Sequence, residues 1–201
     1  MPRQNRVTPL GTFEAVTHHG AFMGNRGDLH RADGTIGPRR WQHSHWVCCV
    51  LETGKSYRAP FDTPGRYTPL FFHDETVALA AGHRPCAQCR RTDFNRFVAG
   101  WEKVHRLAPG SIRVGELDAA LQAARIDGKA QRRYQAVLET LPDGTFVLDP
   151  QSHRPLKIES GGGRPWSHDG YGPFQAIDSE ATVTVLTPRP IVEVLAAGYL
   201  A

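Results

Sequence analysis

The four cysteines of this chain form two close pairs. Cys48 and Cys49 are adjacent, and Cys86 and Cys89 form a Cys-x-x-Cys motif in the segment AGHRPCAQCRR. Two thiolates from one tight turn are a typical half-site for Zn²⁺, which takes four tetrahedral ligands and binds sulfur at about 2.3 Å. The pattern predicts a zinc site with Cys48, Cys49, Cys86 and Cys89 as its ligands.

The upstream pair limits how such a site is completed. Cys48 and Cys49 lie in HWVCCVLE, which is predicted to be a strand. Successive side chains of a strand point to opposite faces, so a regular strand directs only one of the two thiols toward a shared metal. The fourth ligand therefore stays open, with histidines near the two pairs in reserve: His43, His45, His73 and His83.

Two other interpretations of the Cys-x-x-Cys pair are kept. One is a thioredoxin-like redox pair, which typically follows a strand in a βαβ unit, whereas this motif is expected after a helix end. The other is a set of inert, buried cysteines, since cysteine is among the most frequently buried residue types.

Positive charge points to an anionic partner. The chain has a formal net charge of +4, and phosphates are bound largely through Lys and Arg. Arginines gather around the cysteine motif and beside Trp41 and Trp46, an arrangement suited to phosphate contacts and base stacking. The sequence thus predicts a nucleic-acid partner, with DNA favoured, bound through Arg39, Arg40, Arg84, Arg90, Arg91 and Arg96.

A metal-dependent phosphodiester hydrolase is the alternative function. His43 and His45 alternate in QHSHW, and histidine titrates near neutrality, so such a pair can bind a metal or act as base and acid. A second polar group, in MGNRGDLH, contains Asn25, Arg26, Asp28 and His30, although a turn is the first expectation there.

The elements that must position these residues indicate an α+β fold. Short β-like runs at 10–16, 45–52 and 70–72 predict a small antiparallel sheet, followed by a helix at 74–81 that Gly82 ends. A second helix follows Arg91, capped by Thr92 or Asp93, and two helical stretches are expected within 115–141. The second helix is predicted from an apolar stripe at three- and four-residue spacing, formed by Phe94, Phe97, Val98, Trp101 and Val104. Strands at 145–149, 154–160 and 181–187 and a helix from 188 complete the chain, with GGGRPW a turn-rich connection.

These elements suggest a division into two regions. Residues 1–110 are expected to form the zinc-bearing region, and residues 111–201 a helical segment with a small β-sheet. The chain shows no apolar run near the roughly 20 residues of a membrane-spanning helix and no signal-like N-terminus, which predicts a cytoplasmic protein. The oligomeric state is left open.

The segment FFHDETVALAAGHRPCAQCRR carries a family resemblance. It resembles the metal-binding domain of Ada-type DNA methylphosphotriester repair proteins, in which a short helix ending in Ala-Ala-Gly leads into Arg-Pro-Cys-x-x-Cys. The match spans residues 46–91, and the rest of the chain resembles a group of bacterial proteins that implies no mechanism.

The resemblance carries an expectation about chemistry. It implies zinc bound by four cysteines, one of which accepts a methyl group from a DNA phosphotriester. In the family, three residues separate the two upstream cysteines, whereas here they are adjacent. Cys48 or Cys49 stands where the reactive thiolate would be.

Overall fold

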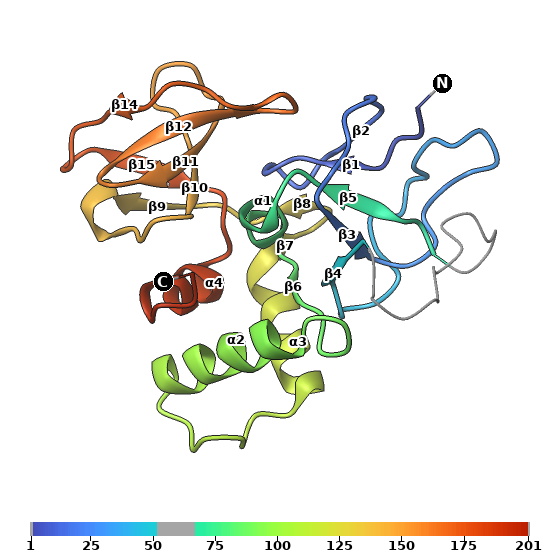
Figure 1. The fold of residues 1–201 in the computed structure, drawn as a ribbon, viewed down its shortest axis with the longest axis horizontal. Coiled ribbons are helices and arrows are strands. Elements are labelled where there is room, and N and C mark those ends of the chain that lie inside the picture. Colours follow the sequence, from blue (N-terminus) through green and yellow to red (C-terminus); the bar gives the residue numbers. More distant parts are fainter. Residues whose placement is uncertain (1, 52–66, 201) are drawn as a thin grey trace.

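The computed structural model describes residues 2–51 and 67–200 (Figure 1). The fold is α+β, as predicted. Two larger sheets lie side by side with a short helix, α1, between them, and helices α2, α3 and α4 lie below (Figure 1).

The first sheet is built from the N-terminal part of the chain. Within the described residues its strand order is β2-β1-β5-β3-β4-β6, a mixed sheet in which β1 pairs in parallel with β5, and β4 with β6. The strands are β1 (Arg6–Val7), β2 (Phe13–Glu14), β3 (Phe22–Asn25), β4 (Val47–Val50), β5 (Leu70–Phe72) and β6 (Arg84–Pro85). The strands predicted at 10–16 and 45–52 are present but shorter, as β2 and β4, and the one predicted at 70–72 is β5; residue 52 lies outside the described ranges. Contrary to the prediction, the sheet is not purely antiparallel, because it contains the two parallel pairings.

Two helices bracket the Cys-x-x-Cys turn. Helix α1 (Glu75–Ala80) begins where Asp74 accepts a hydrogen bond from the Val77 amide, and Gly82 follows with a positive φ of 82°. Helix α2 (Arg91–Val104) buries Phe94, Phe97 and Trp101, which are part of the predicted apolar stripe. The predicted cap is wrong, because the helix already begins at Arg91, and Asp93 instead accepts hydrogen bonds from neighbouring arginines.

The segment after α2 contains the largest difference from the predicted elements. Helix α3 (Val114–Arg125) is present, but the second helical stretch is wrong. The chain instead forms a hairpin of β7 (Ile126–Asp127) and β8 (Ala130–Gln131), then strand β9 (Tyr134–Val137) and a short 3₁₀ turn (Leu138–Thr140). Pairing of β9 with β15 overrides the helix-like spacing of its apolar residues.

The second sheet comprises the C-terminal strands. They are β10 (Phe146–Leu148), β11 (Pro155–Glu159), β12 (Gly162–Ser167), β13 (Gly170–Tyr171), β14 (Gln175–Ala176) and β15 (Thr182–Val185), together with β9. The prediction that GGGRPW only connects strands is wrong: Gly162 and Gly163 pair on one side with β11 and on the other with β14. Helix α4 (Arg189–Ala196) closes the chain with a proline in its first turn.

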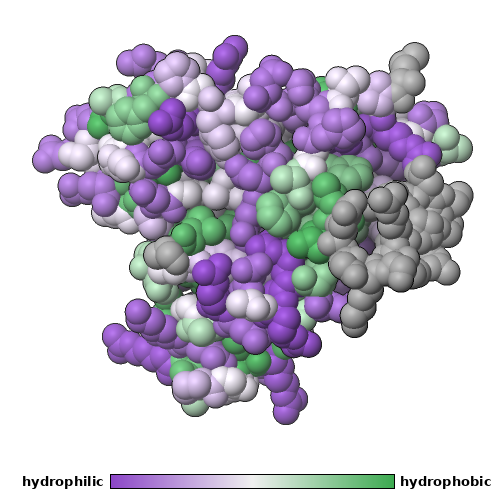
Figure 2. All heavy atoms as spheres, in the orientation of Figure 1, coloured by the Kyte–Doolittle hydropathy of each residue, from purple (hydrophilic) through white to green (hydrophobic). Residues whose placement is uncertain are grey.

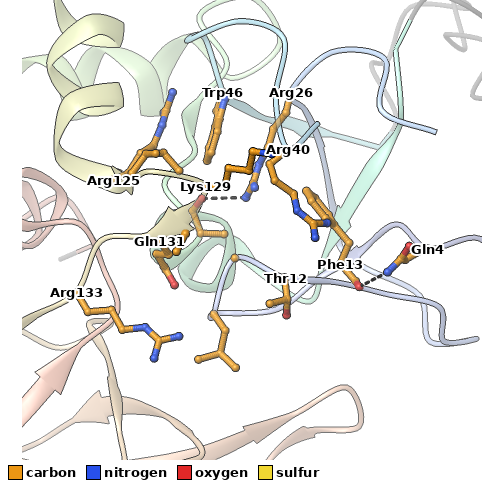
Figure 3. A pocket seen from close by; sticks show the side chains of 15 residues that line it. Gln4, Thr12, Phe13, Arg26, Arg40, Trp46, Arg125, Lys129, Gln131 and Arg133 are labelled. Carbon is orange, nitrogen blue, oxygen red and sulfur yellow. Dashed lines mark hydrogen bonds between the residues drawn. The ribbon is translucent and has the colours of Figure 1, made fainter. Parts of the chain in front are cut away.

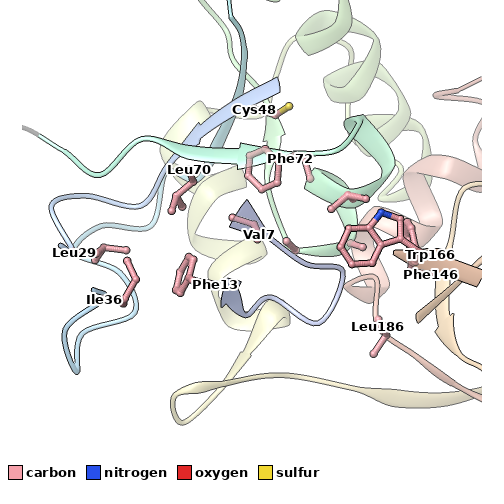
Figure 4. Packing of buried hydrophobic residues seen from close by; sticks show 14 residues of the cluster. Val7, Phe13, Leu29, Ile36, Cys48, Leu70, Phe72, Phe146, Trp166 and Leu186 are labelled. Atoms are coloured by element: carbon pink, nitrogen blue, oxygen red, sulfur yellow. The ribbon is translucent and has the colours of Figure 1, made fainter. Parts of the chain in front are cut away.

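The buried core joins the two predicted regions. Figure 4 shows one cluster that runs from Val7 and Phe72 of the first sheet to Phe146 and Trp166 of the second. A second cluster packs α2 against α3 and α4. The apolar contacts therefore cross the predicted boundary at residue 110.

The surface in the orientation of Figure 1 is mainly hydrophilic, with hydrophobic side chains gathered over β3 and β5 (Figure 2). In the part of the chain that the structure describes, no helix is both long and apolar enough to cross a bilayer.

Candidate metal centre

Three cysteine side chains from two distant segments meet at one place. The sulfur atoms of Cys49, Cys86 and Cys89 all lie within 4.8 Å of one another. A tetrahedral ion with metal–sulfur bonds of about 2.3 Å holds its sulfurs about 3.8 Å apart. The three thiols are therefore spaced as a metal site requires.

Strand pairing positions these sulfurs. Strand β4, which carries Cys49, runs parallel to β6, and the Cys86 amide donates a hydrogen bond of 2.9 Å to the Cys48 carbonyl. The chain then turns, and the Arg90 amide donates to the Cys86 carbonyl at 3.0 Å as α2 begins. The Gln88 amide lies 3.4 Å from the Cys86 sulfur, a backbone N–H aimed at a thiolate position. Pairing of β4 with β6 and the start of α2 thus bring the two cysteine segments together.

Cys48 lies outside this group, which corrects its assignment as a ligand. Its side chain is 1% exposed and belongs to the apolar cluster of Figure 4. The regular pairing of β4 with β3 points the two adjacent thiols to opposite faces, as strand alternation predicted. Burial raises the pKa of the Cys48 thiol, so it stays protonated and apolar in character.

The clustered thiols share protons among themselves. Hydrogen bonds from Cys49 and Cys89 lower the pKa of Cys86, and the same contact with Cys86 raises the pKa of Cys49. One sulfur is thus favoured as a thiolate while its neighbours donate to it. A divalent cation satisfies such a group better, because it stabilises several thiolates together.

The donor set fits Zn²⁺ in type. Sulfur-only ligation is favoured by zinc, Cu(I) and iron–sulfur centres rather than by Mg²⁺ or Ca²⁺. The described residues supply three ligands to the group, and none of the reserve histidines (His43, His45, His73 and His83) joins it. One tetrahedral position is left for a water, a substrate or a residue outside the described ranges.

The surroundings of the Cys-x-x-Cys turn support the redox interpretation, but the number of clustered sulfurs does not. Strand β6 precedes the motif and α2 follows it, which is closer to the surroundings of a dithiol redox pair than the sequence indicated. However, a redox pair needs two sulfurs, and here a third comes from β4. All four cysteines are free thiols in the structure.

Two of the predicted nucleic-acid contacts are engaged inside the protein, which corrects their assignment. Arg84 is 3% exposed and holds the Asp118 carboxylate through two hydrogen bonds. Arg90 is 7% exposed and forms ion pairs of 2.8 Å with both Glu75 and Asp93. Neither guanidinium is free for a phosphate, because each already neutralises a carboxylate.

The other predicted arginines reach solvent. Arg39, Arg40 and Arg91 are exposed. Arg96 is also exposed, and one of its nitrogens lies 3.2 Å from the Asp93 carboxylate. These four remain candidates for phosphate contacts.

The residues of the hydrolase alternative are spread over different contacts. The rings of His43 and His45 stack at 4.2 Å between centroids, and burial lowers the pKa of His43. Arg26 is buried, and His30 contacts the Gln4 carbonyl at 3.2 Å. Among the described residues, no metal-binding group includes a histidine.

Sequence reasoning missed a second polar centre, around Trp46. The guanidinium carbons of Arg26 and Arg125 each lie 3.8 Å from the Trp46 ring centroid. Figure 3 shows them on opposite sides of the indole. Trp46 is 1% exposed, so it does not offer a face to a stacking base. An arginine in a turn and one at a helix end carry no local signal of burial.

No family model, curated protein or solved structure matches this chain. Fold and geometry define a cluster of three cysteines that could hold a metal ion, on a mixed α+β scaffold.

Proposed function

We propose that this protein is a zinc-thiolate protein that acts on nucleic acid, with Cys49, Cys86 and Cys89 as its metal ligands. The observation that carries this proposal is the convergence of three sulfurs within 4.8 Å from β4 and from the turn before α2. Zinc bound there keeps the sulfurs deprotonated and ties β4 to the start of α2.

The proposed reaction is transfer of a methyl group from a phosphate triester to a cysteine. The Cys49 thiolate attacks the methyl carbon, a new S–C bond forms, and the C–O bond breaks. The electron pair of that bond stays on the phosphate oxygen, which leaves as a phosphodiester anion, and no further reactant is needed. Cys49 is the nucleophile because it is the member of the upstream pair that belongs to the cluster, whereas Cys48 is buried in the core.

The proposed nucleic-acid contacts are the exposed arginines Arg39, Arg40, Arg91 and Arg96. Arg91 opens α2 directly after the cysteine turn, so a phosphate held there lies beside the metal ligands. DNA is the favoured partner, and its binding should weaken steeply with salt as neutralised phosphates release counterions.

Metal content tests the zinc assignment. We expect about one equivalent of zinc in the purified protein, and its loss in Cys49→Ser, Cys86→Ser and Cys89→Ser. Cys48→Ala is the matched control: it removes the adjacent thiol, which lies on the other face of β4, and should keep the metal. A protein that binds no zinc, together with an oxidisable Cys86–Cys89 pair, would support the redox interpretation instead.

Mass mapping of cysteines tests the reaction. After incubation with DNA containing methyl phosphotriesters, we expect a gain of one methyl group on Cys49 and none on Cys48. Zinc binding without methylation would retain the metal centre and reject the transfer step. Methylation at Cys48 would contradict the assignment of the nucleophile.

A further inference from the structure

A cavity separate from the cysteine cluster lies between the first sheet and the β7–β8 hairpin. Its volume is about 300 Å³, and five cationic side chains line it: Arg26, Arg40, Arg125, Lys129 and Arg133. Figure 3 shows cations reaching it from both sides, from the segment between β3 and β4 and from α3 with the hairpin and the residues after it. No Asp or Glu is among its lining residues.

Arg26 gives this cavity a buried positive charge that no carboxylate contacts within the described residues. Its side chain is 3% exposed, and its hydrogen bonds go to neutral groups: Nε donates to His83 Nε2 at 3.2 Å, and Nη2 donates to the Ala81 carbonyl at 3.1 Å. Within residues 2–51 and 67–200 we find no carboxylate in contact with it. A buried charge is normally paired, so an unpaired one beside a cavity favours an anion there.

Arg125 adds a second buried guanidinium whose hydrogen-bond partners among the described residues are neutral, with the Asp118 charge acting on it from beyond hydrogen-bond distance. It is 1% exposed and donates to the carbonyls of Gly82 and Ser44 and to the Gln122 side chain. Burial, then the charges of Arg125 and Arg40, lower the pKa of Arg26 well below its usual value. The cations therefore repel one another, and a bound anion would relieve that repulsion.

The position of both guanidinium groups is fixed before any ligand arrives. Trp46 separates them, with each guanidinium stacked on the ring at 3.8 Å. Cation–π contacts are stronger when the groups that make them are desolvated, as these are. Preorganised donors lose little entropy on binding, which favours recognition of one geometry.

Gln131 supplies the complementary acceptor. Its Nε2 lies within hydrogen-bonding distance of the Ala80, Leu186 and Pro9 carbonyls, at 2.6, 2.9 and 3.1 Å. Its Oε1 is buried and has no hydrogen-bond partner among residues 2–51 and 67–200, and the residue lines the cavity. A buried amide oxygen needs a hydrogen-bond donor. A ligand with a hydroxyl group can donate that hydrogen bond to Gln131 Oε1, whereas a fully ionised anion cannot.

From this arrangement we infer that the cavity binds a phosphate ester that also carries a hydroxyl group, such as a nucleotide or a sugar phosphate. Guanidinium groups form charge-assisted hydrogen bonds with phosphate oxygens, and several cations suit a dianion better than a single carboxylate. The volume lies at the lower end of the range for small-molecule sites, so the ligand is small or is the end of a longer chain.

This site stands on observations other than the sulfur cluster. None of the cysteines lines the cavity, so loss of the metal and loss of phosphate binding are separable outcomes. A protein without zinc that binds phosphate esters would retain this inference and reject the proposed metal function. A protein that binds zinc but no phosphate ester would retain the proposed metal function and reject this inference.

The test uses two double variants with equal changes in charge. Arg40→Gln with Arg133→Gln removes two exposed cations that line the cavity. Arg31→Gln with Arg132→Gln is the matched control, because both residues are exposed, neither lines the cavity, and neither is a proposed nucleic-acid contact. Since the buried Arg26 and Arg125 stay in place in both, the two proteins should fold alike, which circular dichroism checks.

Calorimetric titrations of the full chain would use inorganic phosphate, adenosine 5′-monophosphate, glucose 6-phosphate, and a short single-stranded DNA with or without a 5′-phosphate. We expect the cavity variant to bind at least about tenfold more weakly than the wild type, since each lost hydrogen bond to a charged group costs at least that factor. The control variant should bind within about twofold of the wild type.

The ligand series distinguishes the sources of the phosphate. Binding of the mononucleotide or the sugar phosphate identifies a small-molecule site, and binding of only the 5′-phosphorylated DNA identifies a site for a nucleic-acid end. Equal weakening in both double variants would mean that net charge alone attracts the ligand and would overturn the inference. Absence of binding to every probe would overturn it as well.

Discussion

Arg84 and Asp118 form a buried, two-pronged ion pair. Nε of Arg84 lies 2.7 Å from one carboxylate oxygen of Asp118, and Nη2 lies 2.8 Å from the other. Both side chains are at most 5% exposed. Because Arg84 is on β6 and Asp118 is on α3, the pair fixes the start of the cysteine turn to the helical layer.

Breaking this pair should destabilise the protein strongly. Asp118→Ala leaves the Arg84 charge buried and unpaired, and we expect the free energy of unfolding to fall by about 3–5 kcal/mol in urea titrations. As a control, Glu159→Ala removes a carboxylate whose ion pairs with Lys157 and Arg164 are solvent-accessible, and it should cost less than about 1 kcal/mol. The double variant Arg84→Met, Asp118→Leu replaces both charges with apolar side chains, so it should recover most of the lost free energy of unfolding. If the double variant were as unstable as Asp118→Ala, an unpaired buried charge would not explain the loss.

The glycines of β12 provide a second prediction. A Cβ atom at Gly162 would lie 2.4 Å from the backbone oxygen of Gln175 and 2.5 Å from Phe174 Cζ. A backbone oxygen held in a sheet cannot move aside easily, so Gly162→Ala should lower the free energy of unfolding by about 1–3 kcal/mol.

Gly115→Ala is the matched control for that change. It lies in α3, and a Cβ there would meet nothing within 4 Å. Alanine is favoured over glycine inside a helix, so this variant should gain roughly 0.5–1 kcal/mol in the same urea titration. Equal effects of the two substitutions would argue against close packing of β12.

Sequence patterns predicted those elements whose buried face follows from the spacing of their own apolar residues. The stripe of Phe94, Phe97 and Trp101 identified α2, and strand alternation correctly separated the directions of Cys48 and Cys49. In both cases the face that is buried follows from spacing alone.

Elements that depend on distant partners were not predictable in this way. Tyr134, Val137 and Leu138 have helical spacing, yet pairing with β15 makes most of that segment a strand. Gly162 and Gly163 suggest a loop until their neighbours in β11 and β14 are known. The same holds for Arg26 and Arg125, whose burial depends on Trp46 lying between them.

The buried His83 should make stability depend on pH. Its ring is 0% exposed, and Nε2 accepts a hydrogen bond from Arg26, so the ring is neutral. Burial first, and then the charges of Arg26 and Arg125, lower its pKa well below 6.5. In the unfolded chain the same ring takes up a proton near pH 6.5, so below that value the unfolded state binds one more proton than the folded state.

Stability is therefore lost as pH falls below about 6.5, by up to about 1.4 kcal/mol per pH unit from this residue. His83→Gln keeps an acceptor for Arg26 but cannot titrate. The measurement is the free energy of unfolding in urea from pH 7.5 to 5.0. This free energy should fall less steeply with decreasing pH for this variant than for the wild type, and the difference in slope should correspond to the uptake of up to about one proton on unfolding. His19→Gln removes an exposed ring and should leave the wild-type slope unchanged. Parallel curves for wild type and His83→Gln would show that His83 titrates equally in both states, and its burial as a neutral ring beside two arginines would then be wrong.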